Sequence, residues 1–186
     1  LYTFNLPDYP GLTFGFAEKL AAAVPEVTQV ARYCAGIETF VHVDDSDIAA
    51  RVIAVDPSFF QLFPYYGFLD GSPESLASKD DVLLSESFAR AHQLKTGDIL
   101  QTRDWYFTVT GIVKDFRHTL FPYIDIIAHP DSWLNSSAWE APFDRYGSTV
   151  TFALTVPGTD RATLQAKAEA VCKECYPGML GQGFFE

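Results

Sequence analysis

The chain of 186 residues is 48% hydrophobic and 20% charged, a balance that lets it bury a core and argues against an intrinsically disordered segment. Its length fits one compact domain or two small subdomains. The net charge of −11, with no cluster of Lys and Arg, excludes nucleic acid as an expected partner and disfavours flat binding to anionic lipid headgroups.

Apolar runs in the chain are short. None approaches the roughly 18–20 residues that a membrane-spanning helix needs. The chain starts at Leu1, without an initiating Met or a signal-type segment. We therefore expect a processed or excised fragment, and we expect any membrane helices of the parent protein to lie outside these residues.

The first predicted element is an amphipathic helix. Leu12, Phe16, Leu20 and Ala23 recur at helical spacing and form one apolar stripe. Pro25 follows this stripe and predicts the end of the helix, because proline interrupts the helical hydrogen-bond pattern.

Three strands are predicted after the helix. A run at 27–35 is interrupted by Gly36, which we interpret as a break before a second strand at 37–43. The acidic segment 44–47 has the composition of a turn, and a third strand is predicted at 48–55. The second and third strands should therefore form a hairpin.

The segment after the hairpin predicts a short helix. Asp56 can accept hydrogen bonds from free amides, and Pro57 has its φ angle preset for a first turn. We expect this helix at 59–63, with three Phe side chains in the core, and a turn-rich stretch at 67–78.

The middle of the chain is rich in strands. Ser85 or Ser87 can cap a helix predicted at 88–93. Gly111 lies within a predicted strand, which indicates a bulge or a close approach of another backbone segment. The strands expected in this part span residues 81–85, 99–102, 105–113 and 123–128.

A long irregular segment follows, and it is the candidate contact region. Residues 129–147 show no hydrophobic period and hold Trp133, Trp139 and Phe143. Large aromatic side chains dominate protein interfaces, so these three are candidate contacts for a partner or cargo. The alternative is that they fold back onto the core.

The chain ends with a strand and a helix. The strand is predicted at 150–156, and the helix carries Leu164, Ala168, Val171 and Cys175 as its apolar stripe. Both ends of the chain therefore show an amphipathic helix that is closed by a proline two residues past the last apolar position, Pro25 at the start and Pro177 at the end. We therefore predict an α+β fold, with related β-α-β pieces at both ends and a β-rich insertion between them.

The three cysteines allow several interpretations. Cys172 and Cys175 form a C-x-x-C at the end of the last helix, where the helix dipole opposes a thiolate. Structural thiols, a disulfide, and metal or redox chemistry all remain open for this pair. Two sulfurs make a poor zinc site, and Cys34 lies far away in the sequence.

Catalytic motifs are missing from the sequence. The four histidines are scattered, and neither H-E-x-x-H nor G-x-S-x-G occurs. A small hydrolase would have to use His129, Asp131 and Asp144 as its polar cluster. We predict no enzyme, and no catalytic, cofactor-binding or metal-ligating residue.

Several segments of the middle third carry a family resemblance, and they keep a specific order and spacing over about 65 residues. The segments are Arg51–Phe63, Leu69-Asp70-Gly71, Val82–Arg90, Gly97–Leu100 and Phe107–Asp115. Through these segments the chain resembles the MacB-type periplasmic core domain of ABC-transporter permeases of the MacB/FtsX family.

The resemblance implies an architecture and a place in a larger protein. It implies a porter-like subdomain built from both chain ends, about 1–55 and 147–186, and an inserted β-rich, Sabre-like subdomain at about 56–146. The domain would sit between membrane helices, on the periplasmic side of the cell inner membrane.

The resemblance also implies a function without cofactors. The domain would couple ATP hydrolysis by a cytoplasmic ATPase subunit to efflux, lipoprotein release or partner activation, with a permease dimer and a periplasmic adaptor or cargo as partners. The alternative is a free-standing periplasmic or secreted binding protein. The sequence leaves open the cargo, the adaptor and the redox state of Cys172 and Cys175.

Overall fold

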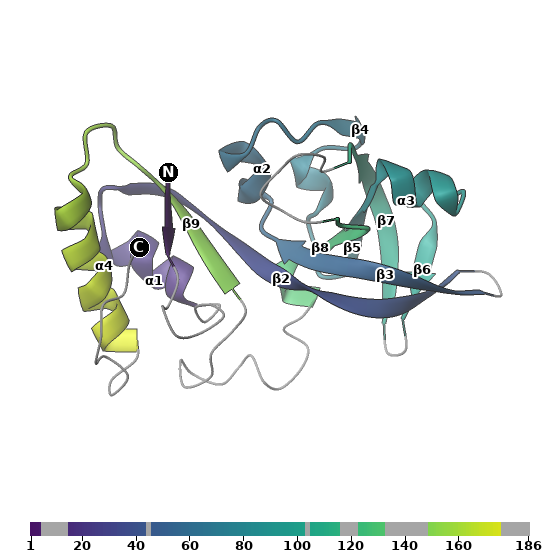
Figure 1. Ribbon diagram of the computed structural model, residues 1–186, viewed down its shortest axis with the longest axis horizontal. Coiled ribbons are helices and arrows are strands. Elements are labelled where there is room, and N and C mark those ends of the chain that lie inside the picture. Colours follow the sequence, from purple (N-terminus) through teal and green to yellow (C-terminus); the bar gives the residue numbers. More distant parts are fainter. Residues whose placement is uncertain (5–14, 44–45, 103–104, 116–122, 133–148, 176–186) are drawn as a thin grey trace. The chain divides into compact units, whose positions relative to one another are not determined.

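The computed structural model describes residues 1–4, 15–43, 46–102, 105–115, 123–132 and 149–175 (Figure 1). The chain forms two compact units. The terminal unit contains Leu1–Cys34 and Ser136–Glu186, and the inserted unit contains Ala35–Asn135. Each unit combines strands with helices, so the predicted α+β class is confirmed. The subdomain limits expected near residues 55 and 147 stay a prediction.

In its described residues, the terminal unit is a three-stranded antiparallel sheet with two helices. Its sheet order is β1-β9-β2, and only the first part of β2 takes part in it, since Val27–Cys34 pair with β9. The elements are β1 (Tyr2–Phe4), α1 (Phe16–Ala23), β2 (Val27–Val43), β9 (Thr149–Thr155) and α4 (Arg161–Cys175).

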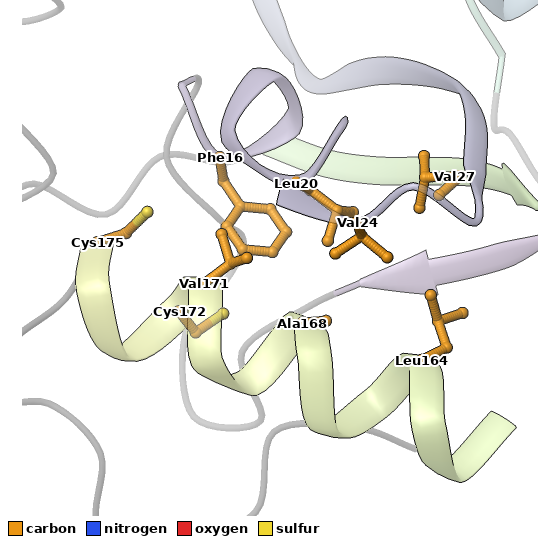
Figure 2. Close-up of a cluster of buried hydrophobic side chains, with 10 residues drawn as sticks. Phe16, Leu20, Val24, Val27, Leu164, Ala168, Val171, Cys172 and Cys175 are labelled. Atoms are coloured by element: carbon orange, nitrogen blue, oxygen red, sulfur yellow. The ribbon is translucent and has the colours of Figure 1, made fainter. Parts of the chain in front are cut away.

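The two helices of the terminal unit share one apolar core, which Figure 2 shows in close-up. Side chains from α1 meet the predicted stripe of α4, so that stripe is confirmed. One detail of the α1 prediction is wrong, because Ala23 is exposed and the next residue, Val24, is buried. The core comprises Phe16, Leu20, Val24, Val27, Ala153, Leu164, Ala168, Val171, Cys172 and Cys175.

The inserted unit is a closed ring of strands with short helices. The strand order is β2-β3-β8-β5-β7, and β6 pairs with both β7 and β2, which closes the ring. Closure gives each strand of the ring two neighbours, and β4 extends the sheet beyond β7. The elements are β3 (Ser46–Val55), α2 (Ser58–Leu62), β4 (Phe68–Asp70), η1 (Pro73–Ser75), β5 (Asp81–Ser85), α3 (Glu86–Ala91), β6 (Ile99–Gln101), β7 (Tyr106–Val113), β8 (Ile126–Ala128) and η2 (Pro130–Ser132).

The expected break at Gly36 is wrong, because β2 continues through it as one strand of 17 residues. A Cβ atom built on Gly36 would lie 3.2 Å from the Val52 carbonyl oxygen and 3.3 Å from Ile53 Cγ2. The glycine therefore allows close contact with β3 and does not end a strand.

Two local predictions in the inserted unit are confirmed. Ser85 caps α3, since its hydroxyl oxygen accepts a hydrogen bond of 3.3 Å from the Phe88 amide. Gly111 lies where the pairing of β5 with β7 shifts register, and a Cβ there would lie 2.9 Å from the Asp70 carbonyl oxygen. The motif glycine therefore marks both a bulge and a close backbone approach.

Candidate functional site

The aromatic residues predicted as contacts, Trp133, Trp139 and Phe143, lie outside the residues that the structure describes. Their role in contacting a partner or cargo therefore stays a prediction. Of the irregular segment 129–147, the structure describes residues 129–132. There the Ser132 amide donates a hydrogen bond of 2.9 Å to the His129 carbonyl oxygen.

The polar cluster considered for a hydrolase is only partly described. His129 Nδ1 accepts a hydrogen bond of 3.2 Å from the Asp131 amide and lies 3.6 Å from the Asp131 carboxylate. These contacts join residues two positions apart and stabilise the turn that leads into η2. Asp144 lies outside the described residues, so the structure does not test the third member.

Two other histidines lie on separate elements. His42 Nδ1 is 3.0 Å from Asp47 Oδ1, and both side chains are exposed. The His92 ring packs against the Phe88 ring at the end of α3, with centroids 4.6 Å apart. In the part of the chain that the structure covers, no group of three or more His, Cys, Asp or Glu side chains is placed to hold a metal ion.

The C-x-x-C pair lies in the core of the terminal unit (Figure 2). Burial raises the pKa of the Cys172 thiol to about 12, and the nearby Cys175 and Glu169 act in the same direction. Burial also raises the pKa of Cys175, against a smaller opposing effect of Lys19. Both thiols are therefore protonated at neutral pH, and a protonated thiol is a poor nucleophile and a poor metal ligand.

The structure brings together a surface that the sequence analysis missed. Phe40 and His42 lie on β2, Gln101 on β6 and Tyr106 on β7, and the register pairs His42 with Gln101 and Gln101 with Tyr106. Residues paired across neighbouring strands point to the same face. Phe40 lies two positions from His42, so it points to this face as well.

A second row extends the same surface. Ile99 of β6 pairs with Thr108 of β7, and Thr108 pairs with Asp81 at the start of β5. The intervening residues Val41 and Leu100 are each 1% exposed and point into the ring. We call the outward surface of Phe40, His42, Ile99, Gln101, Tyr106 and Thr108 the β6 face.

Large apolar side chains project from the β6 face. The exposed fractions are 64% for Phe40, 54% for Ile99 and 64% for Tyr106. No charged residue occurs in β6 or β7. Scattered exposed apolar residues are common on proteins, but neighbouring ones on an uncharged sheet face indicate a contact surface.

The electrostatic surroundings of the β6 face are acidic. Residues 35–135 hold seven basic and fifteen acidic residues, so the inserted unit carries −8 of the total charge of −11. Carboxylates of Glu38, Asp47 and Asp81 flank the face on β2, β3 and β5. Strands were predicted from the sequence at 99–102 and 105–113, but only the closure of the ring joins them to β2.

The described residues contain no helix that is both long enough and apolar enough to cross a membrane. A sequence model of the MacB-like periplasmic core domain matches residues 3–171. No curated protein matches the chain.

Solved structures share the fold at low sequence identity. A domain assigned to a permease protein from Porphyromonas gingivalis is 19% identical, with a TM-score of 0.75, over 88% of this chain and 71% of that one. The periplasmic region of MacB from Actinobacillus actinomycetemcomitans is 15% identical, with a TM-score of 0.69, over 92% and 81%. The extracellular domain of the noncanonic ABC-type transporter YknZ from Gram-positive bacteria is 14% identical, with a TM-score of 0.68, over 92% and 91%.

Proposed function

The chain belongs to the family of MacB-like periplasmic core domains, which are periplasmic domains of ABC-transporter permeases, and from this premise we propose that it couples cytoplasmic ATP hydrolysis to events outside the membrane. The coupling is a shift between two conformations of the transporter. Such a shift needs differential contacts in the two states and no reactive residue.

One observation carries the proposal: both ends of the described chain belong to the terminal unit. β1 pairs with β9, and α4 packs against α1. In a permease whose membrane helices flank this domain, movement of those helices would reach the terminal unit first. The shared core of α1 and α4 would keep the two attachment points together.

The proposal includes partners and location. A cytoplasmic ATPase subunit acts through the transmembrane region of the parent permease, which works as a dimer in the inner membrane with this domain on the periplasmic side. A periplasmic adaptor or a cargo molecule is the outer partner. Efflux, lipoprotein release and activation of a partner are the events that such a domain would serve.

The test is a distance measurement in the full-length permease with its ATPase, reconstituted in lipid nanodiscs. Lys173, an exposed residue in the last turn of α4, is replaced by Cys and spin-labelled. We expect a dipolar distance between the two copies that changes between the nucleotide-free and ATP-bound states.

The native cysteines provide the control for this experiment. Cys34, Cys172 and Cys175 are buried, so these thiols should label weakly without the introduced Cys, and any cysteines elsewhere in the permease and its ATPase are replaced beforehand. An ATPase subunit that binds but does not hydrolyse ATP should hold one distance. A measured distance that is identical in every nucleotide state would refute the coupling, and the absence of any dipolar signal would refute the dimer.

We further propose that Trp133, Trp139 and Phe143 contact the outer partner or cargo. The support for this proposal is their residue type, because large aromatic side chains dominate protein interfaces. All three lie outside the described residues. Replacing Trp105 by Phe leaves Trp133 and Trp139 as the two Trp residues of the chain, and their fluorescence is excited selectively over that of Tyr. We expect acrylamide to quench the Trp fluorescence strongly. Quenching as weak as that of a buried Trp would refute the contact role of these residues.

A further inference from the structure

We propose that the β6 face is a docking surface for an extended segment of a partner protein, whose side chains toward this face are apolar at the centre and Arg or Lys at both ends. The inference deepens the proposed function, and rests on it, because it names the chemistry of the outer partner. It is carried by the geometry and charge of the inserted unit.

The first argument is the shape of the surface. Neighbouring strands lie about 4.8 Å apart, and residues i and i+2 lie about 6.7 Å apart. The side chains of Phe40, Ile99 and Tyr106 therefore project from a lattice with the spacing of a β-sheet. An extended segment, whose alternate side chains have the same spacing, can place its apolar residues between them.

The second argument is the charge pattern. Glu38 lies beside Phe40 on β2, and Asp47 bonds to His42, so carboxylates border one side of the β6 face. Asp81 pairs with Thr108 on the other side, where its carboxylate accepts hydrogen bonds from the Ala77 and Ser78 amides and keeps its charge. The centre, strand β6, is uncharged. An apolar centre with an acidic border complements a segment with an apolar centre and a basic border.

The aromatic residues favour the same partner. A guanidinium or ammonium group over the face of a Tyr or Phe ring gains a cation–π interaction. Phe40 and Tyr106 are each 64% exposed, so their rings are accessible to such a group. Arg serves this surface best, because it can stack on a ring and bind a carboxylate at the same time.

Charge also decides against a second copy of this chain as the occupant. Two inserted units would bring net charges of −8 together, and both β6 faces would be bordered by carboxylates. Like charges across an interface oppose association. The occupant is therefore a different protein with a basic contact segment.

The experiment uses the 186-residue chain, labelled with nitrogen-15, and two synthetic octapeptides with blocked ends. The probe has the sequence Arg-Arg-Leu-Thr-Leu-Thr-Arg-Arg, which places two Leu between two Arg on one face of an extended chain, and the control peptide has Glu in place of each Arg. NMR titration should show the probe shifting the amide signals of Ile99, Gln101 and Tyr106. The Glu peptide should leave these signals in place.

Surface variants identify the contact residues. Phe40→Ser and Tyr106→Ser should each weaken binding of the probe about tenfold, the effect of losing one interface anchor. The matched control is Tyr123→Ser, because Tyr123 is 89% exposed and precedes β8. Glu38→Gln should weaken binding and reduce its dependence on salt.

Several results would overturn the proposal. Equal binding of the Glu peptide refutes the role of charge, and unchanged binding by Tyr106→Ser refutes the role of the aromatic side chains. Self-association of the chain that Tyr106→Ser abolishes would assign the β6 face to a second copy. None of these results changes the distance between labels on Lys173, so the coupling proposal is tested separately.

Discussion

Three glycines of the inserted unit allow the cost of backbone angle and the cost of crowding to be separated. Gly97 has a φ of +96°, and a Cβ there would have no atom within 4 Å. Gly111 has no positive φ, and its Cβ would lie 2.9 Å from both the Asp70 carbonyl oxygen and Leu83 Cδ2. Gly71 combines a φ of +78° with a contact of 2.9 Å to the Thr110 carbonyl oxygen.

The magnitudes follow from these two costs. Gly97→Ala should lower the free energy of unfolding by about 1 kcal/mol, the cost of placing an L-residue in the left-handed region. Gly111→Ala should cost about 2 kcal/mol through overpacking against backbone that cannot move away. Gly71→Ala suffers both effects, so its loss should be about 3 kcal/mol.

The assay is urea unfolding followed by circular dichroism, with the slope of the transition checked for constancy. Gly158→Ala is the matched control, because Gly158 has a φ of +84° with no atom within 4 Å of a Cβ and belongs to the terminal unit. If the two units unfold separately, this variant shifts a different transition. A Gly111→Ala protein as stable as Gly97→Ala would refute the crowding argument.

Three further predictions concern the terminal unit. Leu164→Ala should reduce the free energy of unfolding by about 2–5 kcal/mol, because Leu164 is 2% exposed in the helix core; calorimetry measures this, and a loss below 1 kcal/mol would contradict the packing. Cys172 should react with a thiol reagent at the rate of unfolding, since its pKa of about 12 keeps it protonated; Cys172→Ala identifies the signal, and fast labelling of the folded chain would contradict burial. Hydrogen bonds from the Thr163 amide and hydroxyl, both 2.8 Å, lower the pKa of Asp160, so its stabilising effect should be present above about pH 4 and disappear as the pH falls. Melting temperatures of Asp160→Asn should lack this component, and identical pH profiles for both proteins would contradict it.

Local patterns in the sequence predicted much of the fold, because each depends on neighbouring residues. The stripe of α4, from Leu164 to Cys175, is buried as its spacing predicts. Ser85 caps α3, and Gly111 marks the bulge, since both roles follow from residue type and local position. The α+β class follows from the same local assignments.

Features that depend on distant residues were not predicted. Gly36 is a strand breaker in isolation, but it lies inside β2 because β3 packs closely against it. The β6 face requires the pairing of His42 with Gln101, which closes the ring. The residues at 99–102 predict a strand, but they identify neither its exposed face nor the strand that lies beside it.

The terminal unit is built from two segments that are far apart in the sequence, and this arrangement also sets the order of folding during synthesis. Cys34 and Thr149, which contact each other in the terminal unit, lie 115 positions apart. At ribosomal speeds the N-terminal segment waits roughly ten seconds for β9 to emerge, whereas residues 35–135 are complete earlier. The inserted ring should therefore be the first part to fold, and the portion bearing both termini the last.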